Sequence, residues 1–253
     1  RSVFIAKPGW VLVGVDSKSN QMRQLAASLV DVLPPGDEAF TKAVLTGNSK
    51  EGTDLHSLNM KRTGIIHRNI VKNFFYGCIL FGAGIPKTAK ILQTDLATAK
   101  ATKETFLNEM PLLKEFLRIE TERWRKSAKK TSNAWGKTEY KNGYITGIDG
   151  RPILVEFEKD ILCYYLQSDE AIQMACAFVW FFQDMKKAGY VYGRDYGTVI
   201  WMHDEWNTEC KTEIADETAR IAKECIAKAG RFFKIKVPHE GDAKIGTNWH
   251  EVH

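Results

Sequence analysis

Residues 10–16 read Trp-Val-Leu-Val-Gly-Val-Asp, a run of large apolar and β-branched side chains that ends at Asp16. This composition is typical of a buried β-strand. A carboxylate at the end of an apolar strand is costly unless it is paired or binds a metal ion. The stretch therefore predicts a central strand that brings one acidic group to a functional site, with an ordinary turn aspartate as the simpler alternative.

A polar tip between two apolar runs supplies a second acidic position. Residues 198–202 (Thr-Val-Ile-Trp-Met) and 206–210 flank His-Asp-Glu at 203–205, a pattern that indicates a β-hairpin. If this hairpin pairs with the first strand, Asp16 and Asp204 converge. Two convergent carboxylates suit magnesium ions, which keep several waters and bind substrate phosphates. From the pattern alone, two turn aspartates are the more common outcome.

The rest of the chain is mainly helical in pattern. Helices are expected over residues 21–32, 54–61 with Asp54 as a cap, 67–80, 168–188 and 214–230, and two more between 92 and 130, separated near Pro111. Gly82, Gly84 and Pro86 are expected to close the third helix. Hairpin signals over 135–155 and a short strand over 232–237 complete the order. A small antiparallel sheet from both chain ends, with a helical insertion between them, predicts an α+β fold.

A basic stripe is predicted on the helix over residues 67–80. Arg68, Lys72 and Tyr76 are spaced by four residues, so they lie along one side of the helix. Arginine and lysine on one stripe can hold a triphosphate, and a tyrosine one turn further can stack on a sugar or base. A solvated basic face beside a core aromatic residue is the alternative.

The composition places few limits on function. The 253 residues have a formal net charge of +5, a mild basic excess that is compatible with a nucleic-acid partner without requiring one. Five scattered cysteines without a CxxC pair argue against a disulfide framework or a zinc site, and for a reducing compartment. The longest apolar run, residues 171–182, is too short to span a bilayer, and no signal peptide is visible. These features predict a soluble protein of the cytoplasm.

Three longer motifs follow one another along the chain. They are Val-Asp-Ser-Lys-Ser-Asn-Gln-Met-Arg at 15–23, Arg-Asn-Ile-Val-Lys-Asn-Phe-Phe-Tyr-Gly at 68–77 and Met-His-Asp-Glu at 202–205. Weaker matches lie at 1–6, 54–56, 149–151, 166–168 and 246–253. Together, over essentially the whole chain, they resemble the family A (DNA polymerase I-like) DNA polymerases. The last match resembles the C-terminus of the replicative enzymes of short-tailed phages.

The resemblance implies a polymerase right-hand palm, built on an antiparallel sheet, with a helical fingers insertion. Residues 1–30 and 146–253 would form the palm, and residues 31–145 the fingers. The implied activity is template-directed addition of deoxynucleotides, supplied as triphosphates, to the 3′ end of a primer on primer–template DNA by two-metal phosphoryl transfer. If a phage encodes the chain, the host cytoplasm is its expected location.

The resemblance also assigns a role to each matching residue. Asp16 and Asp204, with the main-chain carbonyl of Ser17, would bind two Mg²⁺ ions, and Glu205 would support this catalytic site from its edge. Lys72 would protonate the leaving pyrophosphate. The nucleotide-binding residues would be Arg68, Lys72, Tyr76, His56, Gln21 and Ser17, and the primer–template contacts would come from Arg151, Gln167 and His203.

Three departures from the family pattern stand out. Gln21 takes the place of a glutamate that excludes ribonucleotides sterically, so we expect weaker sugar discrimination because a charge-assisted hydrogen bond is lost. One extra residue lies before the second aromatic residue of the fingers helix, Phe81, which indicates a π-bulge. Cys163 replaces an asparagine, and the pair Asp169-Glu170 replaces small residues. Two additional acids near the negatively charged primer are unfavourable, and the sequence does not explain their presence.

Family A enzymes contain a thumb and an exonuclease-like domain before the segment that this chain resembles. The chain starts with Arg1 and soon enters its first strand, so we expect either a piece of a longer protein or a split enzyme whose partner chain supplies those domains. A non-catalytic subunit of a split polymerase that binds primed DNA is an alternative. A relative of the single-subunit RNA polymerases, which share the palm, is another.

Residues 118–141 are rich in lysine and arginine and contain Trp124 and Trp135. A track for nucleic acid has this composition. The interleaved Glu120 and Glu122, with Glu115 just before them, favour the other interpretation, a solvated helix face with mixed charges.

Overall fold

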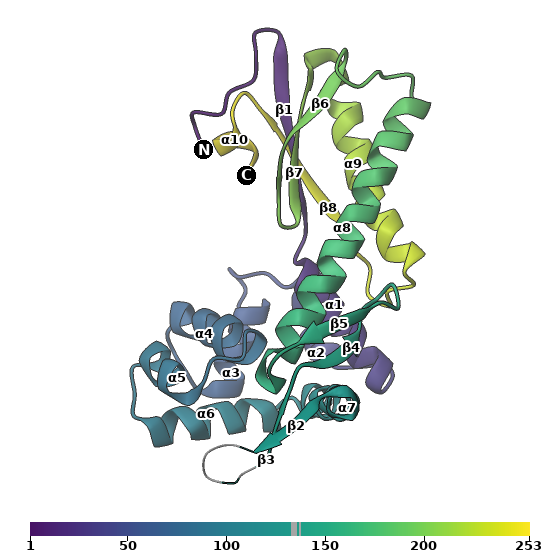
Figure 1. Ribbon diagram of the computed structural model, residues 1–253. Helices are drawn as coiled ribbons and strands as arrows, with labels where there is room; N and C mark the ends of the chain where they lie inside the picture. Colours follow the sequence, from purple (N-terminus) through teal and green to yellow (C-terminus); the bar gives the residue numbers. More distant parts are fainter. Residues whose placement is uncertain (133–135, 137) are drawn as a thin grey trace. The chain divides into compact units, whose positions relative to one another are not determined.

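The computed structural model describes residues 1–132, 136 and 138–253 (Figure 1). The chain folds into two compact units, of which the first combines Arg1–Gln21 with Asp169–His253 and the second is Met22–Ser168. The first unit is therefore built from both ends of the chain, and the second is a continuous insertion. This order confirms the predicted α+β fold, in which a sheet formed by the two ends is interrupted by a mainly helical segment.

The first unit contains a four-stranded antiparallel sheet. Its strands are β1 (Trp10–Ser17), β6 (Tyr196–Met202), β7 (Glu205–Lys211) and β8 (Gly241–Gly246), in the order β6-β7-β1-β8. β1 pairs with β7 from Trp10 opposite Lys211 to Asp16 opposite Glu205. The predicted first strand, the predicted hairpin and their pairing are thus confirmed.

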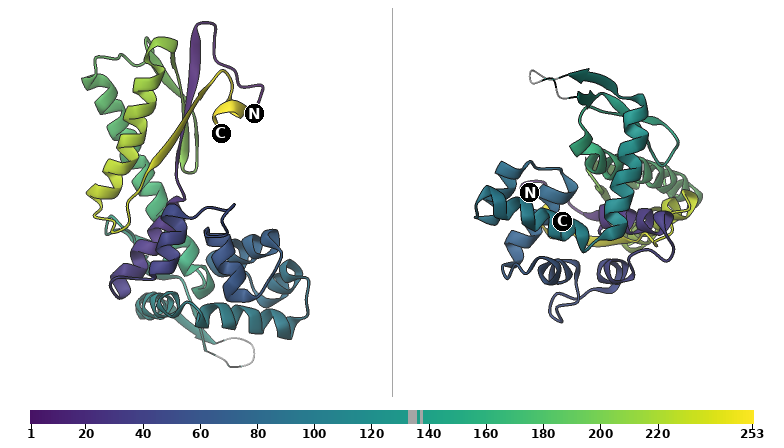
Figure 2. Two further views of the ribbon diagram at one scale, coloured as in Figure 1. Left: turned by 180° about the vertical axis from the view of Figure 1, so that it is seen from behind. Right: turned by 90° about the horizontal axis from the view of Figure 1, so that it is seen from below.

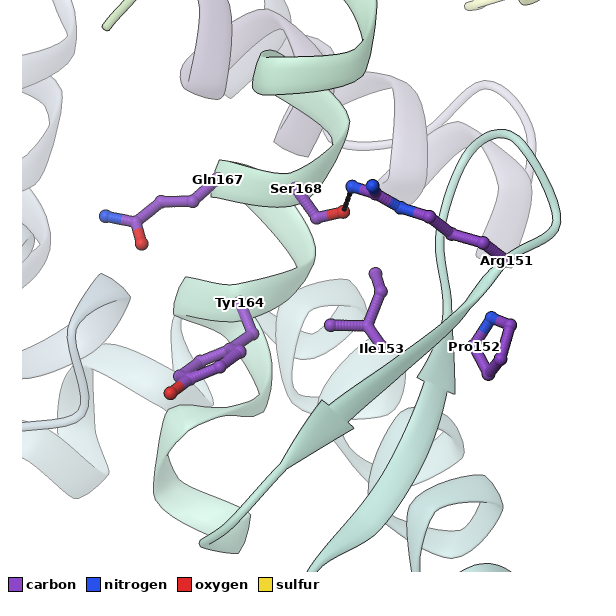
Figure 3. A pocket seen from close by; sticks show the side chains of 6 residues that line it. All are labelled: Arg151, Pro152, Ile153, Tyr164, Gln167 and Ser168. Carbon is purple, nitrogen blue, oxygen red and sulfur yellow. Dashed lines mark hydrogen bonds between the residues drawn. The ribbon is translucent and has the colours of Figure 1, made fainter.

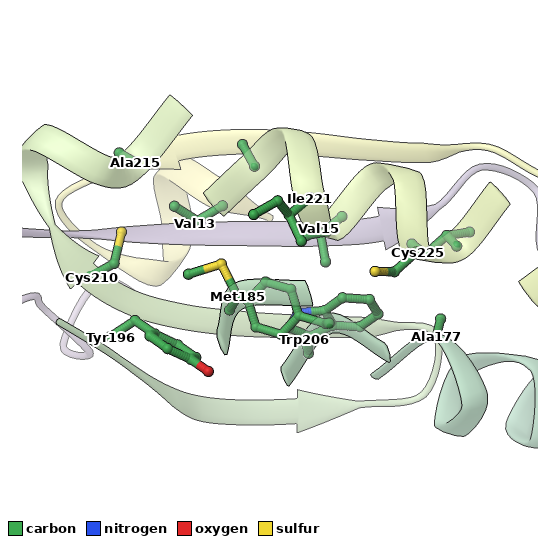
Figure 4. Close-up of a cluster of buried hydrophobic side chains, with 14 of the residues drawn as sticks. Val13, Val15, Ala177, Met185, Tyr196, Trp206, Cys210, Ala215, Ile221 and Cys225 are labelled. Atoms are coloured by element: carbon green, nitrogen blue, oxygen red, sulfur yellow. The ribbon is translucent and has the colours of Figure 1, made fainter. Parts of the chain in front are cut away.

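Alternate residues of β1 face two different layers. Val13 and Val15 are buried in the cluster of Figure 4, against side chains from α8 (Ile161–Lys187) and α9 (Ala215–Phe232). Leu12 faces the other way and packs against Trp249 and Val252 of the short helix α10 (Trp249–Val252). Figure 2 shows α9 on one side of the sheet, with α10 and both chain termini on the other. The sheet is therefore covered on both faces.

The close approach of α10 to the sheet depends on Gly14. A Cβ atom at this position would lie 2.5 Å from the carbonyl oxygen of Val252 and 2.8 Å from Oδ1 of Asn207. Both distances are far below van der Waals contact, and the first involves backbone that cannot rotate away. The glycine is thus required by the space between β1 and α10.

The second unit is mainly helical. It contains most of α1 (Asn20–Val32) and the helices α2 (Glu38–Thr46), α3 (Leu55–Thr63), α4 (Arg68–Phe74), the π-helix η1 (Phe75–Leu80), α5 (Ile85–Leu92), α6 (Leu96–Asn108) and α7 (Pro111–Ser127). Two small hairpins follow, formed by β2 (Lys129–Ser132) with β3 (Thr138–Lys141) and by β4 (Gly143–Thr146) with β5 (Pro152–Val155). Short 3₁₀ turns lie at Glu158–Asp160 in this unit and at Thr212–Ile214 in the first. Within the described part of the chain, no helix is both long and apolar enough to cross a membrane.

Two helices of this unit are absent from the sequence prediction. Asp37 caps α2 by accepting a hydrogen bond from the Phe40 N–H at 2.9 Å, but the helix is too short to show a clear period. α5 has Pro86 in its first turn, where a missing N–H costs nothing, so this proline opens a helix instead of closing the preceding one. The predicted cap at Asp54 is confirmed, because its side chain accepts a hydrogen bond from the His56 N–H.

One predicted boundary and one predicted strand were wrong. α8 begins at Ile161 and not at residue 168, because Ile161 and Leu166 are buried and extend its apolar side toward the N-terminus. The predicted strand over 232–237 is not a strand. α9 continues to Phe232, and its end is closed by Lys234 with a φ of 55° and by a bond from the Ile235 N–H to the Gly230 carbonyl. The alternating apolar residues after α9 imitate a strand, whereas β8 begins only at Gly241.

The basic segment over 118–141 is a solvated helix face as far as α7 extends, and its remaining described residues belong to the β2–β3 hairpin. On α7, Arg118 pairs with Glu115 at 2.7 Å and with Glu122 at 2.6 Å. Trp124 is fully buried and donates a hydrogen bond to the Val155 carbonyl at 2.9 Å, so it belongs to the core. Trp135 lies outside the described residues.

We expect Gly14→Ala to lower the free energy of unfolding by about 1–3 kcal/mol, because the added methyl group would overlap the Val252 carbonyl. Gly197→Ala in β6 is the matched control, since a Cβ atom there meets nothing within 4 Å. Chemical unfolding of the three proteins, followed by tryptophan fluorescence, provides the comparison. Equal stability of the two variants would contradict the packing argument.

Candidate active site

Asp16 and Asp204 are brought together at one end of the β1–β7 pair. Asp16 lies opposite Glu205 in the register of the two strands, and the Ser17 N–H donates a hydrogen bond to the main-chain carbonyl of Asp204 at 3.1 Å. The negative charge of Asp204 acts on the Asp16 carboxyl group. The convergence of aspartates that the sequence predicted is therefore present.

A tight loop holds Asp204 in this position. Met202 and Glu205 are paired across the hairpin, so His203 and Asp204 alone form its turn. His203 takes a φ of 55°, which is uncommon for a residue other than glycine, although histidine adopts it more readily than most. The Trp201 indole N–H donates to the His203 carbonyl at 3.3 Å and helps to fix the turn. The His203 side chain is exposed beside the acidic pair.

The acidic groups at this corner repel one another. Packing around the Asp16 carboxyl group, together with the charges of Asp204 and Glu205, raises the pKa of Asp16 to about 7, although part of the side chain still meets solvent. Burial and the charges of Asp204 and Asp16 raise the pKa of Glu170 to about 7 as well, against the effect of a hydrogen bond from Gln21. A cation between the carboxylates would relieve this repulsion, so the donor set fits a divalent metal ion.

The protein side chains at this site would supply only part of the ligand shell of a metal ion. Over residues 1–132, 136 and 138–253, no three His, Cys, Asp or Glu side chains form a ready-made metal-binding group. Magnesium is usually bound through one or two carboxylates, with waters and substrate phosphates completing its shell. Asp16 and Asp204, with the Ser17 carbonyl, would supply such a two-carboxylate set.

Glu205 is buried and is held by the end of the chain. Its carboxylate accepts hydrogen bonds from the Asn207 amide at 2.6 Å and the Trp249 indole at 2.9 Å, and it also contacts Nδ1 of His253. Burial alone would raise the pKa of Glu205, but these hydrogen bonds outweigh it and hold the pKa below its ordinary value. Glu205 therefore stays ionised and fixes the hairpin beside Asp204, a supporting position at the edge of the site. The contacts of Glu205 with Trp249 and His253 were not predicted, because more than 40 residues separate the partners.

Gln21 lies one turn beyond β1, in the first turn of α1. Its side-chain amide donates a hydrogen bond to Oε2 of Glu170 on α8, at 2.6 Å. In the turn that connects β1 to α1, the buried hydroxyl of Ser17 accepts a hydrogen bond from the Asn20 side-chain amide at 3.0 Å. Glu170 has a place in this site that the sequence did not reveal, because 149 residues separate it from Gln21.

In the second unit, Arg68 is oriented by Asp54. Its guanidinium group donates to both carboxylate oxygens of Asp54, one of them at 2.9 Å, and to the Ser57 hydroxyl at 3.3 Å. The hydrogen bond from Arg68 holds the pKa of Asp54 well below its usual range. Asp54 also caps α3, so one carboxylate links the start of α3 to the start of α4. Asp54 was predicted as a helix cap, but its second contact, with Arg68, was not predicted.

His56 and Tyr76 lie side by side next to this ion pair. Their ring centroids are 6.0 Å apart, and both side chains are half-buried. Burial and the nearby positive charge of Arg68 lower the pKa of His56, which favours a neutral imidazole. Lys72 is exposed. The structure thus brings Arg68, His56 and Tyr76 into one region of the second unit.

The predicted bulge of the fingers helix is confirmed. Residues Phe75–Leu80 form a π-helix, and the Phe81 N–H bonds to the Tyr76 carbonyl, five residues back, at 2.9 Å. Phe81 is 42% exposed, in contrast to the fully buried Phe74 and Phe75. Its side chain is therefore available at the surface.

Arg151 and Gln167 line one pocket of the second unit (Figure 3). The pocket has a volume of about 390 Å³, and its other walls come from Pro152, Ile153, Tyr164 and Ser168. Arg151 donates to the Ser168 hydroxyl at 2.7 Å, and its charge is balanced by Asp149 at 3.6 Å. Two residues that the sequence assigned to primer–template contact are thus neighbours, while His203 belongs to the first unit.

A sheet that ends in paired aspartates, interrupted by a helical insertion with a basic stripe, is the architecture of a polymerase palm with fingers. Comparison with solved structures agrees, since the chain resembles the POL domain of Pol1 from M. smegmatis, solved with DNA primer-template and dNTP. The TM-score is 0.72 at 22% identity, over 98% of this chain and 42% of that one. At this identity the likeness shows the fold.

The model of the family described as DNA polymerase family A matches residues 1–251, so the chain belongs to this family. Among its relatives, the DNA-directed DNA polymerases of Enterobacteria phage T3 and Escherichia phage T7 are 26% and 25% identical to it, each over 96% of this chain and 34% of the relative. The thermostable DNA polymerase I of Thermus aquaticus is 23% identical over 98% of this chain and 28% of the relative. The chain thus spans about a third of the length of these relatives.

The raised pKa of Asp16 predicts how stability varies with pH. A carboxyl group with a pKa near 4 in the unfolded chain and about 7 in the folded chain stabilises the fold fully below about pH 4, and this contribution is lost as the pH rises through 7. In chelator, wild type should therefore lose more stability between pH 4 and 8 than Asp16→Asn. Urea unfolding at several pH values measures the difference, with the exposed Asp216→Asn as control. Parallel curves for wild type and Asp16→Asn would contradict it.

Glu205→Ala should lower the free energy of unfolding by about 2 kcal/mol or more, because it leaves the buried donors of Asn207 and Trp249 without an acceptor. Glu213→Ala is the control, since Glu213 is exposed in the short 3₁₀ turn before α9. Chemical unfolding at pH 7 compares the two. If both variants were as stable as wild type, the hydrogen bonds to Glu205 would not support the hairpin.

Proposed function

We propose that this chain is the catalytic core of a DNA-directed DNA polymerase that adds deoxynucleotides to the 3′ end of a primer. The observation that supports this most directly is the pairing of β1 with β7, which places Asp16 beside Asp204 at the end of the sheet. Membership of DNA polymerase family A gives the reaction class. The chain spans only part of its relatives, so its own activity is a proposal.

Asp16, Asp204 and the Ser17 carbonyl would hold the metal ions of this reaction. Two bound Mg²⁺ ions would lower the pKa of the primer 3′-hydroxyl and neutralise charge on the leaving pyrophosphate. The raised pKa of Asp16 supports this assignment, because burial and the negative charges of Asp204 and Glu205, which a bound cation would offset, are its main causes. Glu205 would keep the hairpin in place while its own carboxylate remains occupied by protein donors.

Residues of the second unit would bind the triphosphate. Arg68, oriented by Asp54, offers a planar guanidinium group, and the exposed Lys72 offers a mobile ammonium group that can also donate a proton to the pyrophosphate. A neutral His56 would donate a hydrogen bond to a phosphate oxygen. Tyr76, one side of which packs against His56, would stack on the sugar or base.

The primer–template would be contacted by three further residues. Arg151 and Gln167 share one pocket, and His203 stands exposed next to Asp204. Such contacts read the backbone and the minor groove, so they check the shape of a base pair and not its sequence.

Since about two thirds of the related polymerases has no counterpart in this chain, we also propose that a thumb and an exonuclease-like domain act with it, either in a partner chain or in a longer polypeptide.

Single-nucleotide extension of a primed DNA template with Mg²⁺ tests the proposal. We expect extension by wild type and a loss of about a thousandfold or more in Asp204→Ala, because a metal-holding carboxylate contributes several kcal/mol to the transition state. The exposed Asp216→Ala in the first turn of α9 is the control and should match wild type.

The same assay separates the other possibilities. Extension that appears only after addition of an extract from the source organism, and is lost with Asp204→Ala, would indicate that a second chain is needed. Preference for ribonucleoside triphosphates would favour an RNA polymerase. Binding of primed DNA without any Asp204-dependent extension would overturn the proposal in favour of a non-catalytic DNA-binding subunit.

A further inference from the structure

Two residues that depart from the family pattern meet in space. Gln21 stands where the family has a glutamate, and Glu170 stands where it has a small residue. In the folded chain the Gln21 amide donates to the Glu170 carboxylate at 2.6 Å. The two departures are therefore the two ends of one hydrogen bond between α1 and α8.

Glu170 occupies a position that is costly without partners. It is only 8% exposed, and the negative charges of Asp204 and Asp16 act on its carboxyl group, which accepts a hydrogen bond from Gln21. A buried acid next to a second acid is destabilising unless donors surround it. The Gln21 amide supplies such a donor. Glutamate at position 21 would instead add a third carboxylate beside Glu170 and Asp204, so the amide at 21 and the acid at 170 are matched to each other.

We propose that Glu170 is a positioning residue for sugar selection, which holds the Gln21 side chain against the ribose of the incoming nucleotide and so excludes a 2′-hydroxyl group. This proposal rests on the polymerase function proposed above. From Gln21 alone we expected weaker sugar discrimination, because the glutamate of the family is lost. The structure shows a carboxylate that still takes part in a hydrogen bond at this position, supplied by Glu170 in place of residue 21.

The physical basis is side-chain entropy. A free glutamine side chain populates many rotamers and could swing aside to admit a larger sugar. A short hydrogen bond to a buried carboxyl group restricts it to one orientation, because leaving that orientation would leave a buried Glu170 oxygen without its donor. The steric wall at position 21 is thus rigid only while Glu170 is present.

The test compares four proteins in single-nucleotide extension with deoxynucleoside and ribonucleoside triphosphates. They are wild type, Glu170→Ala, the exchanged pair Gln21→Glu with Glu170→Gln, and Asp184→Ala. Asp184 is an acid of the same helix that pairs with Lys187 and Lys228, so its removal is the matched control. The quantity measured is the ratio of kcat/KM for the two sugars.

We expect Glu170→Ala to lower the deoxynucleotide preference by about tenfold or more, since the restraint that it removes is a hydrogen bond to a charged group. The main change should be a lower KM for ribonucleotides. The exchanged pair restores an acid–amide bond of opposite polarity and should recover most of the preference. A merely structural role of Glu170 would reduce the rates for both sugars together and would not be rescued by the exchange.

Thermal unfolding in chelator gives a second readout that needs no activity. The single variants Gln21→Ala and Glu170→Ala and their combination should shift the Tm in a non-additive way, because either change alone removes the same bond. Additive shifts, or an unchanged sugar ratio in an active Glu170→Ala, would overturn the proposal. A shift in metal dependence with equal losses for both sugars would overturn it too, and would assign Glu170 to the metal site. Absence of Asp204-dependent extension by wild type would instead refute the polymerase function itself, and the sugar-selection role with it.

Discussion

The register between β1 and β7 is the constraint on which the functional geometry depends. Side chains alternate from one face of a strand to the other, so a slip of one residue would expose Val13 and Val15 and would separate Asp16 from the hairpin turn. Burial fixes that register from one side of the sheet. Gly14 fixes it from the other, because α10 fits only against a position without a side chain. The position of two carboxylates is thus determined by the packing of apolar groups several residues away.

The acidic corner is held together by donors from distant parts of the chain. Glu205 is supported from Asn207 in its own strand and from Trp249 in the last helix, and Glu170 is supported from Gln21 at the start of α1. Each acid that the fold buries here therefore has a particular hydrogen-bond partner. Burial and the mutual repulsion of these acids nevertheless raise the pKa of both Asp16 and Glu170 to about 7. The hydrogen bonds keep the folded chain stable, and the remaining negative charge still attracts a cation.

The sequence allowed the sheet and its two aspartates to be predicted because both depend on local signals. An apolar strand that stops at an acid, and a polar tip between two apolar runs, are visible within short windows. Helix α5 was missed because the same proline can end one helix or open the next, and the strand expected over 232–237 was wrong because a left-handed Lys234 has no sequence signature. The contact between Gln21 and Glu170 could not be predicted for a different reason. Each residue was recognised as unusual, but only the folded chain shows that they touch.

The π-helix at Phe75–Leu80 allows one additional residue in the middle of a helix. An inserted residue in the middle of an α-helix would normally rotate everything beyond it by about 100° and destroy the contacts of one side. Here one wide turn absorbs the additional residue, with the Phe81 N–H reaching back to the Tyr76 carbonyl, so the α-helical turns that carry Arg68 and Lys72 ahead of it keep their spacing. A helix can therefore accommodate one more residue at this point without disturbing the turns that carry Arg68 and Lys72.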